Sequence, residues 1–313
     1  MRGKNKFLVT AILILFGTVL LVVGYFGKIY IDIKRTANNS YESVERISDS
    51  KRKNYVDYAE GDPFSVLLLG IDSGDYGRED QGRSDVLIVA TVNPQNKTTT
   101  LLSIPRDTYT DIIGKDKKDK INHAYAYGGV AMAIASVENL LDIPIDHYAQ
   151  VDLKGIKEIV DLVGGIKVNN KFSFKYGATE LPIGKLTLNG EEALHYSRMR
   201  YDDPNGDYGR QERQRQVIVG ILNKVKSVDT LTNYDNVLQV LGNNFKTDFS
   251  WQTIISLFEN YRVALTNIDS CQLLGEELIG DGVIGEEGIS YQKIDEDELL
   301  KVKENLKEQL NIL

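Results

Sequence analysis

Cysteine and histidine are scarce in this chain of 313 residues, which has one cysteine, Cys271, and three histidines. A single cysteine excludes an intramolecular disulfide and is typical of a small buried apolar residue. The histidines, His123, His147 and His195, lack the spacing of zinc ligands. The sequence also contains no Walker motif, no GxSxG elbow and no HExxH motif, so it offers no signature of those nucleotide, hydrolase or zinc sites.

Basic residues are outnumbered, with 37 Lys and Arg against 45 Asp and Glu, which gives a formal net charge of −8. Proteins whose main partner is nucleic acid usually carry a basic face, so the charge balance argues against that class. The apolar content of 42% supports a sizeable core. The length suits one large domain or two small ones.

One long segment, residues 7–27, contains no charged residue and is rich in Leu, Val and Ile. As a helix it would span roughly 30 Å, enough to cross a bilayer. A cleaved signal peptide is the alternative, but the run is long and no A-x-A-like cleavage site follows it. We therefore predict a single-pass anchor in the cell membrane, with residues 1–6 as a cytoplasmic tail and the rest of the chain extracytoplasmic.

After the anchor, residues 28–61 are polar and predict a partly helical stalk, and residues 62–313 predict the folded domain. Strands and helices alternate in this domain, which predicts an α/β fold with helices on both faces of a central sheet. Residues 172–183 are expected to be irregular. Strands are expected at 65–71, 85–92, 98–104, 147–151, 166–168, 184–188, 268–274 and 289–294, and helices at 130–141, 153–163, 191–196, 209–226, 231–243, 251–265 and 295–310.

The first three predicted strands have polar residues where they begin or end. If these strands form an antiparallel meander, Asp72, Asp85, Arg106 and Asp107 gather at one end of the sheet. Two carboxylates beside an arginine suit a divalent cation with a phosphate. Each aspartate taken alone fits a strand-end turn better, but the four residues together favour a binding site.

The segment 196–216 holds five arginines in this acidic protein. Arg198 and Arg200 are two positions apart, so they share one side only where the backbone is extended. Arg210 falls in the first turn of a predicted helix, where a cation opposes the helix dipole unless an anion binds there. Gln214 lies one turn further on the same face.

These four residues predict an anion site, with phosphate as the best candidate. The alternative is a solvated charged helix face paired with nearby Asp and Glu residues. That alternative fits the other two arginines of the segment, Arg213 and Arg215, which we assign to the surface or to pairing along the helix.

Four pieces of sequence together resemble the LytR-CpsA-Psr family of Gram-positive cell envelopes: LLLGID at 67–72, GRSD at 82–85, SIPRD at 103–107, and SRMR…GDYGRQERQ ending at Gln214. The resemblance is close over 64–226 and looser over 227–313. It implies an α/β/α sandwich around a central mixed sheet, with a deep apolar pocket for a polyprenyl tail. It also implies that residues 62–313 form a catalytic domain.

The activity implied by the resemblance is a phosphotransferase. Its donor is an undecaprenyl-diphosphate-linked glycopolymer, such as wall teichoic acid, capsule or another secondary wall polysaccharide. Its acceptor is the 6-hydroxyl of N-acetylmuramic acid in peptidoglycan. A membrane anchor suits such a donor, and no nucleic acid partner is expected.

Site roles also follow from the resemblance. Asp72 and Asp85 match aspartates that hold Mg²⁺, or Mn²⁺ in its place. Asp85 and Asp107 both remain candidates for the general base, with Arg106 as their catalytic partner. The positions that match residues facing the diphosphate are Arg83, Arg106, Arg198, Arg200, Arg210 and Gln214.

Two other functions remain open at this point. The first is a membrane-bound regulator or transcription attenuator, although the sequence contains no defensible helix-turn-helix pattern. The second is a non-catalytic protein that binds a polyprenyl phosphate on the same scaffold. A regulator and a transferase differ in the side of the membrane on which the domain lies. A non-catalytic binding protein differs from a transferase because it does not turn over its ligand.

Overall fold

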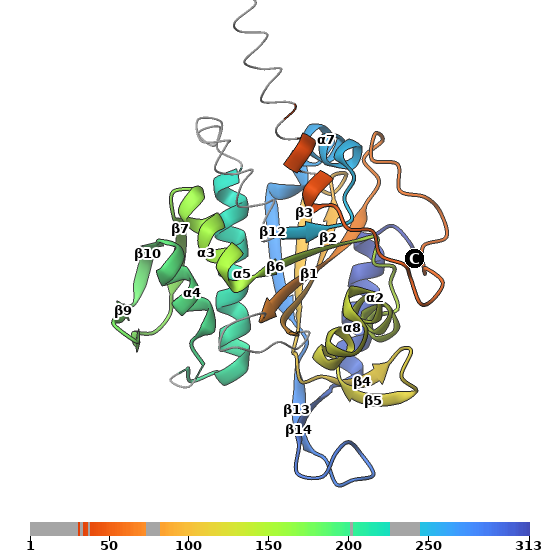
Figure 1. Cartoon of the computed structure of the whole chain (residues 1–313), viewed down its shortest axis with the longest axis vertical. Coiled ribbons are helices and arrows are strands. Elements are labelled where there is room, and N and C mark those ends of the chain that lie inside the picture. Colours follow the sequence, from red (N-terminus) through yellow and green to blue (C-terminus); the bar gives the residue numbers. More distant parts are fainter. Residues whose placement is uncertain (1–30, 32–33, 37, 73–81, 201–202, 226–244) are drawn as a thin grey trace, which may run out of the picture.

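The computed structural model describes residues 31, 34–36, 38–72, 82–200, 203–225 and 245–313. A six-stranded sheet lies at its centre, with the strand order β11-β6-β1-β2-β3-β12 (Figure 1). The strands of this sheet are β1 (Phe64–Asp72), β2 (Arg83–Asn93), β3 (Thr98–Ile104), β6 (His147–Asp152), β11 (Phe245–Thr247) and β12 (Asn267–Gln272).

The strands β1, β2 and β3 form the antiparallel meander that the sequence predicts. In addition, β1 pairs in parallel with β6, β3 pairs in parallel with β12, and β11 runs antiparallel to β6. The central sheet is therefore mixed, as expected. The observed bounds of β3 coincide with the predicted ones, and β1 and β2 extend only slightly beyond theirs.

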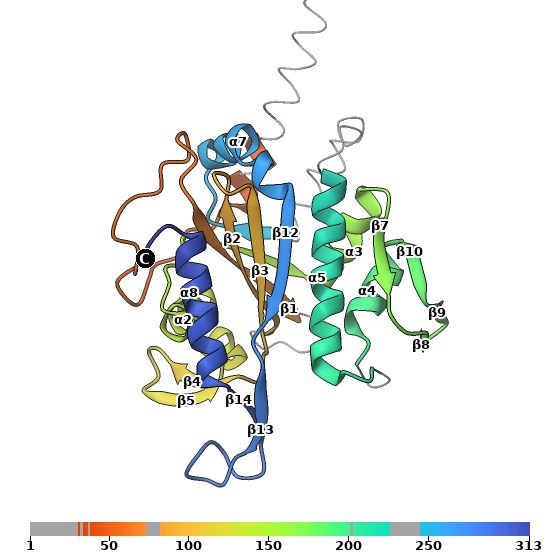
Figure 2. The same cartoon turned by 180° about the vertical axis from the view of Figure 1, so that it is seen from behind.

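Successive side chains of a strand face opposite sides of the sheet, and the two sides of this sheet are covered differently. On one side, Leu67 and Leu69 of β1 join a buried core completed by α2 (Asn122–Leu141) and α8 (Glu296–Gln309). Figures 1 and 2 show these two helices together on that side. The residues that form this core are buried in close contact with one another.

The opposite side is covered by α3 (Leu153–Leu162), α4 (Gly190–Arg198) and α5 (Gly206–Val225). These helices share a second apolar cluster with two small sheets. We call this group of elements, residues 153–225, the helical lobe. Its strands are β7 (Ile166–Asn170), β8 (Phe174–Tyr176), β9 (Thr179–Leu181) and β10 (Gly184–Leu188), paired as β7–β10 and β8–β9.

Two further hairpins extend from the body. One consists of β4 (Tyr109–Ile112) and β5 (Lys117–Lys120). The other consists of β13 (Gly275–Ile279) and β14 (Ser290–Ile294), and it projects from the end of the central sheet (Figures 1 and 2). The helix α7 (Trp251–Asn260) and a 3₁₀ turn, Arg262–Leu265, precede β12.

The structure differs from the sequence predictions in three places. Residues 172–183 are not irregular, because β8 and β9 form a hairpin there. The helix α2 begins at Asn122 and is interrupted at Gly128 and Gly129, where Gly129 has φ 61° and ψ −150°, so the predicted helix 130–141 is its second half. The strands β4, β5, β11 and β13 carry no strong pattern and were not predicted, while the predicted helix at 231–243 lies outside the described residues.

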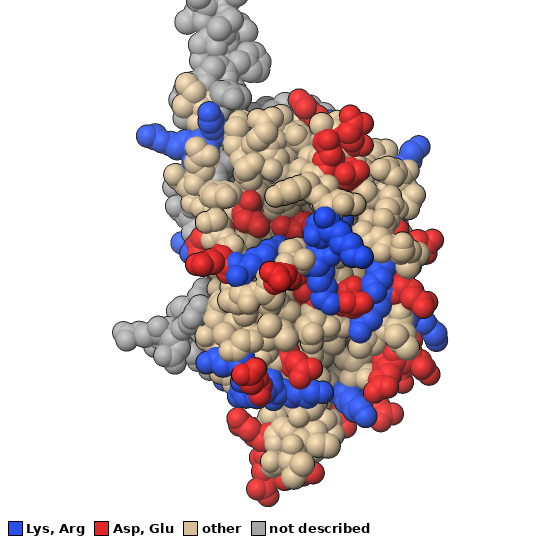
Figure 3. Space-filling view, turned by 90° about the vertical axis from the view of Figure 1, so that its right-hand side faces the viewer, with Lys and Arg blue, Asp and Glu red and all other residues tan. Residues whose placement is uncertain are grey.

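Residues 41–61, in the predicted stalk, lie against the domain. Arg46 forms an ion pair with Glu138, and Arg52 forms one with Asp146. The predicted membrane anchor at 7–27 lies outside the described residues, and no helix within them is long and apolar enough to cross a bilayer. Figure 3 shows the face over α2 and α8, where basic and acidic side chains are interspersed.

Candidate active site

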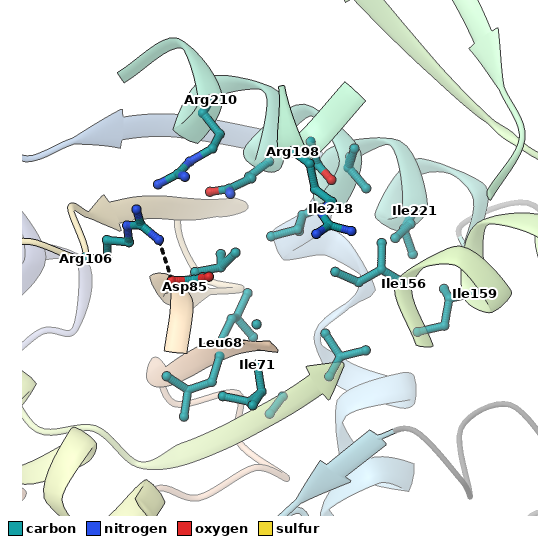
Figure 4. A pocket seen from close by; sticks show the side chains of 18 of the residues that line it. Leu68, Ile71, Asp85, Arg106, Ile156, Ile159, Arg198, Arg210, Ile218 and Ile221 are labelled. Carbon is teal, nitrogen blue, oxygen red and sulfur yellow. Dashed lines mark hydrogen bonds and ion pairs between the residues drawn. The ribbon is translucent and has the colours of Figure 1, made fainter. Parts of the chain in front are cut away.

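A cavity of about 430 Å³ lies between the central sheet and the helical lobe. Figure 4 shows that apolar side chains from the sheet and from two helices face one another across it. One end of this cavity carries charged residues instead. The apolar residues that line it include Leu68, Ile71, Val86, Ala149, Val151, Ile156, Ile159, Val217, Ile218, Ile221 and Phe245.

A β-bulge brings Asp85 into this cavity. Gly70 pairs with Val86 but Ile71 pairs with Ser84, so Asp85 is an extra residue on β2. A bulge turns a strand locally and lets neighbouring side chains reach the same face. Asp85 and Val86 accordingly both line the cavity. Gly70 is required at this point, because a Cβ there would lie 2.8 Å from the Cβ of Val86.

The charged end of the cavity is formed by residues of β2, α4 and α5 and of the segments that follow β3 and α4. Nη1 of Arg106 donates to Oδ1 of Asp85 at 2.7 Å, drawn as a dashed line in Figure 4. Burial lowers the pKa of the Arg106 guanidinium, but Asp85 and Asp107 outweigh that effect and raise the pKa overall. The charged and polar residues that line this end are Asp85, Arg106, Arg198, Arg200, Arg210 and Gln214.

Arg210 approaches the same end of the cavity from α5 (Figure 4). Its side chain is 10% exposed and is paired with Asp207, one turn earlier in the helix. Burial lowers the pKa of Arg210, Asp207 opposes this shift, and the nearby Arg106 adds to it. The Nε atoms of Arg106 and Arg210 are both buried without a hydrogen-bond acceptor. An anion placed between these guanidinium groups would be stabilised by both positive charges.

Arg198 and Arg200 owe their positions to a buried ion pair. Arg198 ends α4, and the intervening residue Met199 is buried while Arg200 is exposed. Arg213 donates from Nε to the carbonyl oxygen of Tyr196 at 2.8 Å and from Nη2 to the carbonyl oxygen of Met199. Its Nη1 pairs with Asp203, which is equally buried. Arg213 thus ties the α4–α5 connection to α5, and this holds Arg198 and Arg200 at the border of the cavity.

The assignment of Arg213 and Arg215 to the surface is wrong, because both side chains are buried. Arg213 lies within cation–π distance of Phe172, Phe174 and Tyr196. Charge and spacing in the sequence could not reveal this burial, since Phe172 and Phe174 come from the region of the unpredicted β8–β9 hairpin. Gly209 offers a weak signal, because any Cβ there would clash with the carboxylate of Asp203.

Three predicted site residues are not placed at the cavity. Arg83 is exposed at the start of β2 and does not border it. Asp107 does not line it either: Oδ1 of Asp107 lies 2.8 Å from Nζ of Lys120, and its Oδ2 lies 3.6 Å from Nε of Arg106. The backbone of Asp72 pairs with Arg83 at the end of β1, but the side chain of Asp72 lies outside the described residues.

Several residues at the site were missed by the sequence analysis. Asp207 holds Arg210, and Lys120 holds Asp107. Ser197 and Tyr176 line the cavity, and the ring of Tyr176 lies 4.8 Å from that of His195. Asp207 precedes Arg210 by one helical turn, a spacing that favours their pairing. Nothing in the sequence singles out Tyr176.

The carboxylates of the described residues can hold a divalent cation only if a bound phosphate group supplies further oxygen atoms. Within the described residues no three His, Cys, Asp or Glu side chains lie close enough to share a metal ion. Mg²⁺, however, is commonly held by one or two carboxylates and completes its shell with phosphate oxygens and water. Asp85 at the charged end, with the β1 terminus at Asp72 beside the same bulge, suits that mode of binding.

The fold and the cavity define an α/β protein whose cavity suits an amphipathic anion, with apolar walls for a chain and arginines at one end for a charged group. The model of the LytR_cpsA_psr family matches residues 28–308. The chain therefore belongs to the LytR-CpsA-Psr family.

Named relatives support this membership. The chain is 50% identical, over 312 residues and 99% of both proteins, to an Enterococcus faecalis protein named polyisoprenyl-teichoic acid–peptidoglycan teichoic acid transferase TagU. The crystal structure of Bacillus subtilis TagU matches with a TM-score of 0.63 and 42% identity, over 80% of this chain and 97% of that one. A structure of TagT bound to LIIa-WTA matches with a TM-score of 0.71 and 35% identity, over 86% and 99%.

Proposed function

We propose that this protein transfers an anionic wall glycopolymer, of the teichoic acid class, from a polyprenyl diphosphate to peptidoglycan. The observation that carries the proposal is the cavity, which is apolar along its walls and ends in four arginines. A polyprenyl diphosphate has the same division into a long apolar chain and a charged group. Relatives named as teichoic acid transferases carry the same fold, which supports this substrate class.

The reaction that suits this site is phosphoryl transfer. The acceptor hydroxyl oxygen bonds to the polymer-side phosphorus while the bond to the bridging oxygen breaks, and polyprenyl phosphate leaves with that electron pair. Arg106 and Arg210 would stabilise the charge that develops on the leaving phosphate. The buried Nε donor of Arg210, which has no acceptor, is available for this role.

The proton of the acceptor hydroxyl requires a base. Of the two candidates, Asp85 lines the cavity, whereas Asp107 does not, and its two oxygens lie near Lys120 and Arg106. We therefore assign the base to Asp85 and a positioning role to Asp107, which lies against the Nε side of Arg106.

Mg²⁺ or Mn²⁺ would be held by Asp85 and Asp72 with diphosphate oxygens. When bound, it would neutralise charge on the diphosphate. Independently of the metal, Arg198, Arg200 and Gln214 orient the anion, and the apolar wall keeps water away from the prenyl end.

Reconstitution tests the proposal. The domain would be mixed with a polyprenyl-diphosphate-linked saccharide, Mg²⁺ and peptidoglycan, and transfer would be followed by mass spectrometry. Arg106→Ala and Asp85→Asn should each lower the rate by roughly 10²–10³-fold, as expected for removing a group that acts in the transition state. Lys301→Ala on the distant α8 is a matched control that should leave the rate unchanged.

Two outcomes would contradict the proposal. If the purified protein binds the lipid but gives no product under any metal condition, it is a non-catalytic lipid receptor. If cysteines introduced after residue 61 react with an impermeant thiol reagent only after cell lysis, the domain faces the cytoplasm and a regulatory role is favoured. Full activity of both variants would overturn the site assignment alone.

A further inference from the structure

A second cavity, of about 780 Å³, lies on the side of α5 away from the first. Its floor is formed by α5, one wall by β7 and β10, and the other wall by β12, the edge strand of the central sheet. Figure 2 shows α5 between β12 and the β7–β10 pair. We call this cavity the α5 groove. Its lining residues are Lys167, Val168, Asn169, Lys185, Leu186, Thr187, Glu212, Arg215, Gln216, Val219, Ile268 and Ser270.

Positive charge predominates in the α5 groove, although the protein as a whole carries a net charge of −8. The groove contains three cations, Lys167, Lys185 and Arg215, and none of them forms an ion pair with a carboxylate of the described residues. Its single acidic residue, Glu212, is already paired with Lys171 at 2.6 Å. The groove therefore has unbalanced positive charge.

Arg215 is the deepest of these cations and is 6% exposed. Its Nη1 donates to the hydroxyl of Ser103 at 2.7 Å and its Nη2 donates to the side chain of Gln272 at 3.0 Å, both neutral groups. Its Nε is buried without an acceptor. A buried charge without a counter-charge is costly, so an anion in the groove would stabilise this arrangement. Burial also lowers the pKa of Arg215, and the nearby Glu212 opposes this shift without reversing it.

The wall beside α5 carries a row of polar groups. Lys167 pairs across the strands with Thr187, and Asn169 pairs with Lys185, so all four side chains share one face of the β7–β10 pair. Gln216 accepts a hydrogen bond from the backbone N–H of Asn169 at 3.1 Å, which ties the edge of β7 to α5. Lysines alternating with amide and hydroxyl groups suit a ligand that alternates phosphate with hydroxyl groups.

We propose that the α5 groove binds the polyol-phosphate chain of the polymer during transfer. This inference rests on the proposed function, because that function supplies a polymer with repeating phosphodiesters. The groove is separated from the diphosphate site by α5, so it would hold later units of the chain rather than the reacting phosphate. We expect the α5 groove to increase the affinity for long donors and to leave the rate of the chemical step unchanged.

Two donors that share one lipid and one linkage saccharide test the proposal, one carrying several glycerol-phosphate units and the other none. The variant is Lys167→Ala combined with Lys185→Ala, in which both changed side chains are exposed. The KM for the long donor should rise roughly tenfold, because the variant loses two surface ion pairs between lysine and phosphate. The kcat should not change. The KM for the short donor should stay constant. The matched control is Lys118→Ala combined with Lys301→Ala, two exposed lysines elsewhere.

Equal kinetics of the double variant and the wild type on both donors would overturn the proposal, and so would an equal loss on both. If the wild-type protein transfers neither donor, the proposed function fails. Titration calorimetry with a soluble glycerol-phosphate oligomer then tests binding to the α5 groove independently of transfer. Binding to the wild type that is weakened in the double variant supports the groove. Binding of a neutral oligosaccharide or a peptidoglycan peptide in place of the oligomer overturns it.

Discussion

The two faces of the central sheet are built from the same strands and reach opposite results. Leu67 and its neighbours on one face are covered completely by α2 and α8. Leu68, the next residue of β1, faces a cavity on the other side. Both faces are apolar, so the hydrophobic effect alone does not distinguish a core from a binding site. The difference lies in the covering elements, because α2 and α8 close one face, whereas a cavity remains between the other face and the helical lobe.

The largest expected effect concerns the buried ion pair of that lobe. Arg213→Met should destabilise the protein by about 3–5 kcal/mol, because it leaves the carboxylate of Asp203 buried without a partner. We expect the helical lobe to loosen before the face of the sheet that α2 and α8 cover. Hydrogen exchange should therefore become faster in the amides of α4 and α5. Unfolding in urea gives the free energy.

A double-mutant cycle with Asp203→Asn provides the control. The double variant should recover part of the lost stability, since neither partner then carries a buried charge. Additive losses from the two single changes would show that the pair does not hold the lobe.

A smaller effect comes from truncating the two neighbouring leucines of β1. Leu67→Ala should cost about 2–5 kcal/mol, because it leaves a hole in a closed core. Leu68→Ala should cost about 1 kcal/mol, because part of its surface already faces a cavity. Urea unfolding measures both values, and retention of a polyprenyl phosphate by mass spectrometry should fall only for Leu68→Ala. Equal stability costs would show that the cavity closes in solution.

The smallest effect concerns Asp119 of β5, at the edge of the filled face. Burial raises the pKa of this carboxyl, but contacts with His123, Lys117 and Tyr127 outweigh it and hold the pKa well below its usual range. A carboxyl with a depressed folded-state pKa stabilises the protein above its unfolded pKa, near 3.8, and loses this contribution as the pH falls further.

Asp119→Asn should therefore lower the free energy of unfolding by about 1–3 kcal/mol at pH 7, and the gap to the wild type should narrow as the pH falls below 4. Urea unfolding at a series of pH values measures this gap. A gap that is constant with pH would show that the carboxylate charge contributes nothing.

The sequence predicted the parts of the site that depend on strand ends. Apolar runs with polar ends located β1, β2 and β3, and the meander brought Asp85 and Arg106 together because hairpin-linked strands share an edge. It did not predict how Asp85 enters the cavity, since a bulge depends on the register of two strands and not on either strand alone. The placement of Arg83 away from the cavity follows from the same local geometry.

The arginines show the same limit. Their number and spacing indicated an anion site, and Arg198, Arg200 and Arg210 do border one cavity. Arg213 and Arg215 look like surface residues in the sequence, yet they are buried, because the aromatic β8–β9 hairpin and the edge strand β12 cover them from distant parts of the chain.

The sequence by itself therefore determined the α/β class, the central meander and the identity of the residues that can bind an anion, since these depend on local patterns of apolar and charged side chains. Only the tertiary structure decided which apolar face remains open, which arginines reach the cavity and which are buried. The physical reason is that burial and register depend on contacts between segments far apart in the chain, such as Arg215 with Ser103 and Gln272.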